Sequence, residues 1–359
     1  MTARTSHFFR LGTAAFLLAA SLAVAFDANA AVPQLMGKLT RNSGTIGGRE
    51  RNFLLYLPPD LKPGSPLLLV FHGGGQDAKD LRIATGYEFD LLADKYGFVV
   101  VYPDGIDNGW NACRKSVRRN ARSVDDVAFI EAIIGHQATV NGIDKKRVFA
   151  TGHSNGGAIS FRLALEHPEE FAGVAVISSS LPSQSDMGCK PKNISIPMMI
   201  INGTADPVNP YRGGSNNGRA AGNDPVSGSM GGAGGMMGGG MGERMEPFRG
   251  SSLTLLTSGR GPVMPTEATA AYWAKINGQD GPPERTRLPH VNPDDPTSVE
   301  ILSWIAAGKP PVILYSIVGG GHVVPQKYFR YPRIVGRQTE DMDAPEVIWD
   351  FFSRQPSRP

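Results

Sequence analysis

The stretch VFATGHSNGGAIS, Val148–Ser160, contains two kinds of secondary structure in direct succession. Its first residues form an apolar run typical of a buried strand, and its last residues continue into a helical pattern. Between them, GHSNG, Gly152–Gly156, fits the G-x-S-x-G pattern of a nucleophile elbow, a sharp strand-to-helix turn that lifts a serine hydroxyl above a sheet. Glycines are needed because larger side chains would clash with neighbouring elements in so tight a turn. The pattern therefore predicts Ser154 as a nucleophile.

Apolar, β-branched runs recur along the chain, and most are continuous rather than alternating. This is expected of strands that are buried on both faces of a mainly parallel sheet. The runs lie at 52–58, 66–75, 97–105, 147–157, 173–180, 197–207 and 311–322, and helical patterns occupy 87–97, 123–142, 155–170, 265–278 and 343–355. Strands that alternate with helices predict an α/β fold, doubly wound, with helices on both faces of the sheet.

The N-terminus has the pattern of a secretory signal peptide. Arg4 and Arg10 precede an apolar run, and the small residues Ala28 and Ala30 follow it. The run is too short and too interrupted to favour a membrane anchor. We therefore expect residues 1–30 to be removed and residues 31–359 to form a single exported catalytic domain, secreted or periplasmic, without stable membrane association.

Charge and composition limit the partners and ligands that can be expected. The chain has 36 basic and 33 acidic residues, so its net charge of +3 gives no reason to expect a nucleic-acid partner. A Gly/Met-rich segment at about 213–250 cannot bury a core and predicts a flexible insertion. Its methionines could bind Cu(I), but a simple surface loop is the favoured interpretation, and we expect no metal site and no cofactor.

Cys113 and Cys189 are the two cysteines of the chain. In an exported protein a pair of cysteines favours one disulfide over two buried thiols.

A base and an acid for Ser154 follow from chain order. In α/β folds with a nucleophile elbow, the order is Ser, then the acid, then His. His322 follows the last long apolar run in YSIVGGGHVVP, and Asp206 follows the run MMIING, ahead of Pro207. An Asx turn is the structural alternative for Asp206. The sequence predicts that Ser154 attacks a carbonyl, that His322 transfers the proton and that Asp206 orients His322.

The negative charge that develops on the carbonyl oxygen needs two N–H donors. One is expected from the backbone of Asn155, directly after the nucleophile, and the other from Gly74 in the loop FHGGGQ, 71–76. A phosphate-binding loop is the rival interpretation of such a glycine run, but Lys and Ser/Thr are absent at the required spacing.

Six motifs in this order resemble the exported esterases of the polyhydroxybutyrate depolymerase and feruloyl esterase type: FHGGGQ, YPDGIDNGWNAC, VDDVAFI, ATGHSNGGAIS, INGTADPVNPY and GGGHVVP. The likeness runs from about Arg51 to Phe352. It implies the α/β-hydrolase fold, ester hydrolysis without a cofactor, and the same three residues as catalytic triad. The GWNAC segment implies that Trp110 either lines the substrate cleft or props it from inside.

Three features depart from that family's pattern. Val324 stands where members often have tryptophan, and Gln279 stands where many have a cysteine. The chain ends at Pro359 without the linker and binding domains of depolymerases that attack solid polymer. We therefore expect small or oligomeric esters, of hydroxyalkanoate, feruloyl or acetyl type, as substrates of a serine carboxylester hydrolase. A serine peptidase of related fold and a catalytically silent binding protein are the alternatives.

Overall fold

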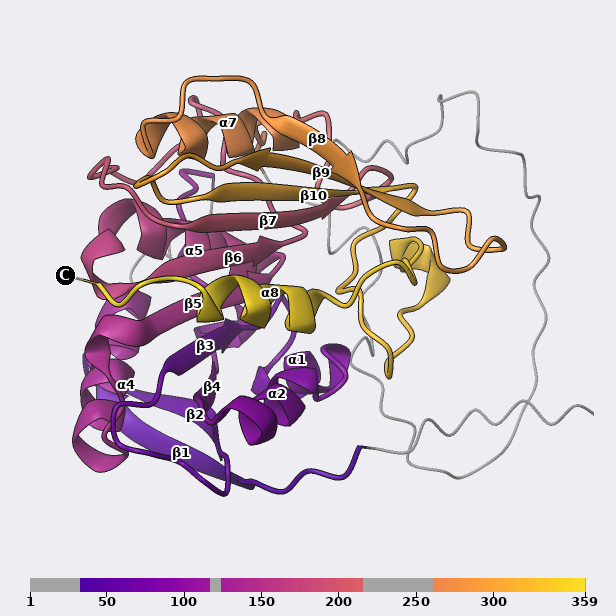
Figure 1. The fold of residues 1–359 in the computed structure, drawn as a ribbon. Helices are drawn as coiled ribbons and strands as arrows, with labels where there is room; N and C mark the ends of the chain where they lie inside the picture. Colours follow the sequence, from indigo (N-terminus) through magenta and orange to yellow (C-terminus); the bar gives the residue numbers. More distant parts are fainter. Residues whose placement is uncertain (1–32, 117–123, 216–260, 359) are drawn as a thin grey trace, which may run out of the picture. The chain divides into compact units, whose positions relative to one another are not determined.

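A ten-stranded mixed sheet forms the centre of the fold within residues 33–116, 124–215 and 261–358, the part of the chain that the computed structural model describes (Figure 1). The strands are β1 Lys38–Ile46, β2 Arg49–Leu57, β3 Leu67–Phe71, β4 Val99–Pro103, β5 Val148–His153, β6 Gly173–Ile177, β7 Met198–Gly203, β8 Glu284–Arg287, β9 Ser298–Trp304 and β10 Val312–Val318. Their order is β1-β2-β4-β3-β5-β6-β7-β10-β9-β8. The strands from β4 to β10 in this order are parallel, and an antiparallel pair completes each edge.

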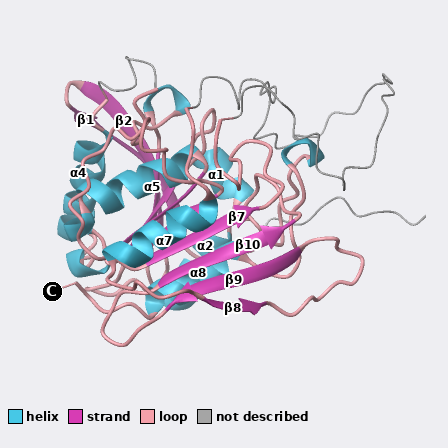
Figure 2. Ribbon diagram, turned by 90° about the horizontal axis from the view of Figure 1, so that it is seen from above, coloured by secondary structure: helices cyan, strands magenta, loops and turns pink. Residues whose placement is uncertain are grey.

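Helices cover both faces of this sheet, as the alternation of apolar runs and helical patterns predicts (Figure 2). The α-helices are α1 Ala78–Ala84, α2 Glu88–Tyr96, α4 Asp126–Val140, α5 Asn155–Glu166, α7 Thr266–Ile276 and α8 Ala344–Ser353, and the short 3₁₀ helices are η1 Ile106–Asn108, η2 Lys145–Arg147, η3 Pro168–Glu170 and η4 Arg333–Val335. One core cluster joins the sheet to α4, α5 and α7, and a second joins the opposite face to α1, α2 and α8. The inner strands β3 to β7 are buried along their whole length, which explains their continuous apolar runs.

The edge strands were not predicted from the sequence. Every residue of β8 is exposed, and β1 is largely exposed, so neither carries an apolar run. The start of α4 also differs from the prediction. Asp125 is its N-cap and accepts a hydrogen bond from the Ala128 N–H at 3.0 Å, so the helix begins three residues after the start of the predicted pattern at 123.

The predicted disulfide between Cys113 and Cys189 is present. It joins the loop after η1 to the loop after β6, and a hydrogen bond from the Gly188 N–H to the Cys113 carbonyl runs beside it. The two positions that depart from the family pattern are both buried: Val324 is 0% exposed in the core, and Gln279 donates from Nε2 to the Pro310 carbonyl at 2.7 Å.

The Gly/Met-rich insertion and the signal segment, residues 1–30, both fall on residues outside the described part, apart from 213–215. The chain on the two sides of residues 216–260 is held together by backbone hydrogen bonds. Gly214 and Val263 exchange two backbone hydrogen bonds of 2.9 Å each, and Val263 also pairs with Pro182. We call this hydrogen-bonded pair, Gly214 with Val263, the neck, because it holds together the residues on the two sides of 216–260.

A buried pair of acidic side chains joins α2 to α8. The Glu88 side chain in the first turn of α2 is hydrogen-bonded to Asp343, whose Oδ1 caps α8 by accepting from the Glu346 N–H at 3.1 Å. Burial and the neighbouring Asp343 carboxylate raise the pKa of Glu88 to about 9. Glu88 therefore keeps its proton in the folded protein at neutral pH.

We expect the Glu88→Gln variant to lose part of the pH dependence of stability. The folded protein holds the Glu88 proton up to about pH 9, whereas the unfolded chain releases it near the ordinary value of 4.5. The folded state thus binds more protons between these values, and stability falls as the pH rises through this window. Thermal unfolding at pH 5, 7 and 9 should show a flatter profile for the variant and a higher Tm than the wild type at pH 9. Parallel profiles would contradict this assignment.

Candidate active site

The nucleophile turn is built by close contacts between backbones. Ser154 lies between β5 and α5 with φ 57° and ψ −114°, a left-handed conformation that is rare for a residue with a side chain. A Cβ on Gly156 would lie 1.9 Å from the Phe71 carbonyl oxygen, and one on Gly152 would lie 2.4 Å from the backbone of Gly156. Only glycine fits at either position, which is the physical reason for the G-x-S-x-G pattern.

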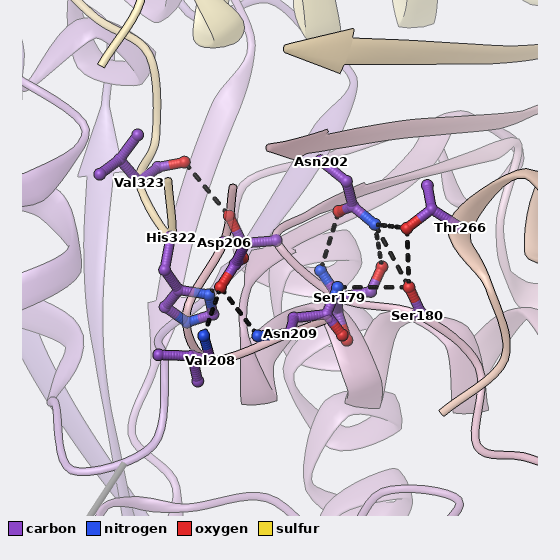
Figure 3. A network of polar contacts seen from close by, with 10 residues as sticks. Ser179, Ser180, Asn202, Asp206, Val208, Asn209, Thr266, His322 and Val323 are labelled. Carbon is purple, nitrogen blue, oxygen red and sulfur yellow. Dashed lines mark hydrogen bonds and ion pairs between the residues drawn. The ribbon is translucent and has the colours of Figure 1, made fainter. Parts of the chain in front are cut away.

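The predicted base and acid meet in the loops that follow two neighbouring parallel strands. His322 Nδ1 lies 2.7 Å from Asp206 Oδ2, and the side chains of both residues are buried (Figure 3). Asp206 follows β7 and His322 follows β10, which is the parallel neighbour of β7. The loops after these strands are in direct contact, because the Ala205 N–H donates to the Gly320 carbonyl at 2.9 Å.

Asp206 forms an Asx turn and also contacts His322, so both interpretations of this residue apply. Its Oδ1 accepts hydrogen bonds from the backbone N–H groups of Val208, at 2.7 Å, and Asn209, at 2.8 Å, which is Asx-turn geometry. Its Oδ2 remains for His322. The turn therefore fixes the carboxylate that orients the imidazole.

His322 also lies beside the nucleophile turn. Its ring centroid is 4.8 Å from that of His153, the residue before Ser154. The His322 backbone N–H donates to the Val335 carbonyl at 2.6 Å. Because Nδ1 is occupied by Asp206, Nε2 is the ring nitrogen available to the serine.

The loop after β3 lies against the same turn. A Cβ on Gly73 would be 3.5 Å from the Ser154 Cβ. Within the loop, the Gly73 N–H donates to Gln76 Oε1 at 3.0 Å and the Gly75 N–H donates to the Asn108 carbonyl at 2.8 Å. The Gly74 N–H has no acceptor among the described residues, so this N–H could donate to a bound group, as predicted.

Asn155 is the second residue predicted to donate a backbone hydrogen bond. It is the first residue of α5, so its N–H has no acceptor within the helix. Its side chain has a separate function, because Asn155 Oδ1 accepts from the Trp110 N–H at 2.7 Å.

Trp110 supports the loop 71–76 from inside the protein. The side chain is only 3% exposed, its Nε1–H donates to the His72 carbonyl at 2.9 Å, and its ring packs edge-on against Phe71. These contacts favour the second of its two interpretations, an internal prop rather than a wall of the cleft.

His72 holds the other side of this loop and was not recognised from the sequence. Its Nε2 accepts from the Gly105 N–H at 2.9 Å, and its Nδ1 lies 2.8 Å from the Gly73 carbonyl. Burial lowers the pKa of His72 below its usual range. A neutral ring that carries its proton on Nδ1 satisfies both contacts. His72 therefore has a structural role, in which its ring links Gly73 to Gly105.

Residues 51–209 match the family model described as Esterase PHB depolymerase. Over these residues the chain is similar to esterases of this family. The matched segment contains Ser154 and Asp206, whereas His322 lies beyond it.

Curated relatives of the chain are also named as esterases. It is 28% identical to an esterase named NocK from Nocardia uniformis over 87% of this chain and 82% of the relative. It is 32% identical to feruloyl esterase C from Emericella nidulans over 49% of this chain, and this match spans 62% of the length of the relative. Among solved structures, acetyl xylan esterase from Aspergillus awamori has the same fold, with a TM-score of 0.52 and 14% identity over 88% of this chain and 99% of the other.

No group of three or more His, Cys, Asp or Glu side chains within 33–116, 124–215 and 261–358 is arranged to hold a metal ion. None of the helices in these ranges combines the length and the apolar character that a membrane crossing requires. The methionines of the Gly/Met-rich segment lie outside these ranges.

We expect Gly156→Ala to destabilise the esterase by about 3 kcal/mol, because the added methyl group overlaps the Phe71 carbonyl. Gly135 in α4 is a matched control, since a Cβ there meets nothing within 4 Å. Gly135→Ala should stabilise the protein by about 0.5–1 kcal/mol, as usual for alanine in a helix interior. Denaturant unfolding of both variants measures the difference, and equal effects would contradict the close contact at Gly156.

Proposed function

We propose that this chain is an exported serine esterase that cleaves small or oligomeric carboxylic esters through an acyl-enzyme, with Ser154, His322 and Asp206 as its catalytic triad. The 2.7 Å contact between His322 Nδ1 and Asp206 Oδ2, beside the Ser154 turn, carries this proposal. The family match supports the class of reaction.

The first half of the reaction follows from the position of each group. Ser154 Oγ attacks the ester carbonyl while His322 Nε2 accepts its proton, and Asp206 stabilises the imidazolium that forms. The carbonyl oxygen becomes negatively charged and accepts hydrogen bonds from the N–H groups of Gly74 and Asn155. The N-terminus of α5, directly behind the serine, adds a favourable field for this charge.

The second half releases both products. The carbon–oxygen bond to the alcohol breaks, and the alcohol leaves with the proton from His322. Water then attacks the acyl-enzyme, giving a proton to His322 Nε2, and the acid is released as Ser154 Oγ takes that proton back. These steps require no resident metal or organic cofactor.

Export from the cytoplasm is part of the same proposal. The disulfide between Cys113 and Cys189 is the structural observation that supports it, since disulfides persist in oxidising compartments. The signal pattern at residues 1–30 adds the targeting step, which leaves residues 31–359 as the catalytic domain.

The acyl group is best determined with a panel of substrates: an aryl butyrate, methyl ferulate, a soluble 3-hydroxybutyrate trimer and an acetylated xylo-oligosaccharide. The names of the relatives, feruloyl esterase and acetyl xylan esterase, motivate two of these substrates. An aminoacyl anilide tests for the peptidase alternative. We expect ester turnover to exceed anilide turnover, and the reverse would overturn the esterase assignment.

We expect Ser154→Ala to lower kcat on the preferred ester by a factor of about 10⁴ or more. Asp206→Asn should lower kcat by about 10⁴, because an amide leaves His322 in the wrong tautomer. Ser353→Ala is a matched control, since this exposed hydroxyl at the end of α8 donates only to the Asp350 carbonyl. A Ser154→Ala variant with wild-type turnover would exclude the triad and favour the catalytically silent alternative.

A further inference from the structure

Three consecutive serines follow β6 and have no role in the mechanism above. The backbone N–H of Ser154 donates to the Ile177 carbonyl, so the serine run 178–180 begins beside the nucleophile turn. A Cβ on Gly157, in the first turn of α5, would lie 2.9 Å from the Ser179 Cβ. Ser178 Oγ donates to the Val323 carbonyl at 3.3 Å, next to His322. The run therefore contacts both the nucleophile turn and the loop of the base.

Asn202, near the end of β7, bonds to this run with its whole carboxamide (Figure 3). Its Oδ1 accepts from the Ser179 N–H at 3.0 Å, and its Nδ2 donates to the Ser179 carbonyl, also at 3.0 Å. The same Nδ2 lies 3.3 Å from Ser180 Oγ and 3.0 Å from Thr266 Oγ1. Asn202 is 1% exposed, so water cannot replace these contacts without opening the core.

The network continues into the loop of the acid. Asn209 Nδ2 donates to Ser180 Oγ at 3.2 Å, and the Asn209 backbone N–H donates to Asp206 Oδ1 at 2.8 Å. One hydroxyl, that of Ser180, thus joins Asn202 to the residue that holds the Asp206 carboxylate. The buried network has connections to the nucleophile turn, the acid loop and the start of α7, where Thr266 lies.

We propose that Asn202 is a positioning residue, which holds the Asp206 loop at a fixed distance from the nucleophile turn through the serine run 178–180. This inference rests on the proposed function, because it assigns Asn202 to the alignment of that triad. A buried hydrogen-bond network of this kind favours one arrangement of its loops, so loss of its central amide leaves the loops free to separate.

The chain contains a matched control at the opposite end of the sheet. Asn277 is also buried, at 3% exposure, and bonds with its whole carboxamide. Its Oδ1 accepts from the Ile196 N–H at 3.0 Å, and its Nδ2 donates to the carbonyls of Ile196 and Pro310 at 2.8 and 3.0 Å. Ile196 and Pro310 precede β7 and β10, whereas Asp206 and His322 follow them. Loss of either amide costs buried hydrogen bonds, but only Asn202 lies at the catalytic end.

The experiment compares Asn202→Ala with Asn277→Ala in the full chain, at a temperature where thermal unfolding shows both variants to be folded. We expect both to lower the Tm. Asn202→Ala should lower kcat for an ester about tenfold or more, equivalent to about 1.4 kcal/mol in the barrier. Its KM should change by less than about twofold, because binding of the ground state is untouched. Labelling of Ser154 by a fluorophosphonate should become slower to a similar extent. Asn277→Ala should retain the wild-type kcat, KM and labelling rate.

Wild-type kcat and labelling in folded Asn202→Ala, or an equal loss in Asn277→Ala, would overturn the positioning role. If Asn202→Ala does not fold, Ser180→Ala replaces it, since this variant removes only the hydroxyl between Asn202 and Asn209. A fall in kcat at constant KM then supports the proposal, and wild-type kcat overturns it. The proposed function is tested separately, because it fails only if the wild type shows no ester turnover that Ser154→Ala abolishes.

Discussion

The contact between the first turn of α5 and the end of β3 is the constraint on which the site depends. Gly156 packs so closely on the Phe71 carbonyl that no side chain fits between them. The residues directly after Phe71 form the proposed oxyanion loop, and the residue two positions before Gly156 is the proposed nucleophile. One backbone contact therefore sets the distance between this serine and the N–H donor proposed to stabilise the charge on the carbonyl oxygen, before any polar interaction is considered.

The acid and the base are brought together by the same type of backbone geometry. Asp206 and His322 are 116 residues apart in the chain but follow neighbouring parallel strands. Their loops approach closely because Gly203 leaves no Cβ in the way; one would lie 2.3 Å from the Gly320 carbonyl oxygen. The two strands bring Asp206 close to His322, and the buried hydrogen bonds around Asp206 then fix the position of its carboxylate.

Sequence reasoning succeeded where a residue type is forced by local geometry or by chain order. Glycines around Ser154, glycines before His322 and continuous apolar runs each have one main physical explanation, so the α/β-hydrolase fold and the candidate triad could be predicted. The edge strand β8 could not, because an exposed, charged segment such as ERTR has no pattern that distinguishes it from a loop. His72, Asn155 and Asn202 were also missed in their supporting roles, since their partners are carbonyls and hydroxyls distant in sequence. The run of three serines after β6 was the only local sign of that network.

The neck formed by Gly214 and Val263 has a consequence for how this chain can vary. Because two backbone bonds hold Gly214 beside Val263, a connection between these residues need not cross the sheet or reach past the catalytic groups. A loop whose two ends lie side by side can be replaced by another polypeptide without moving the residues that flank it. The esterase could therefore accept a reporter peptide or a carbohydrate-binding module between these residues while the catalytic groups keep their positions.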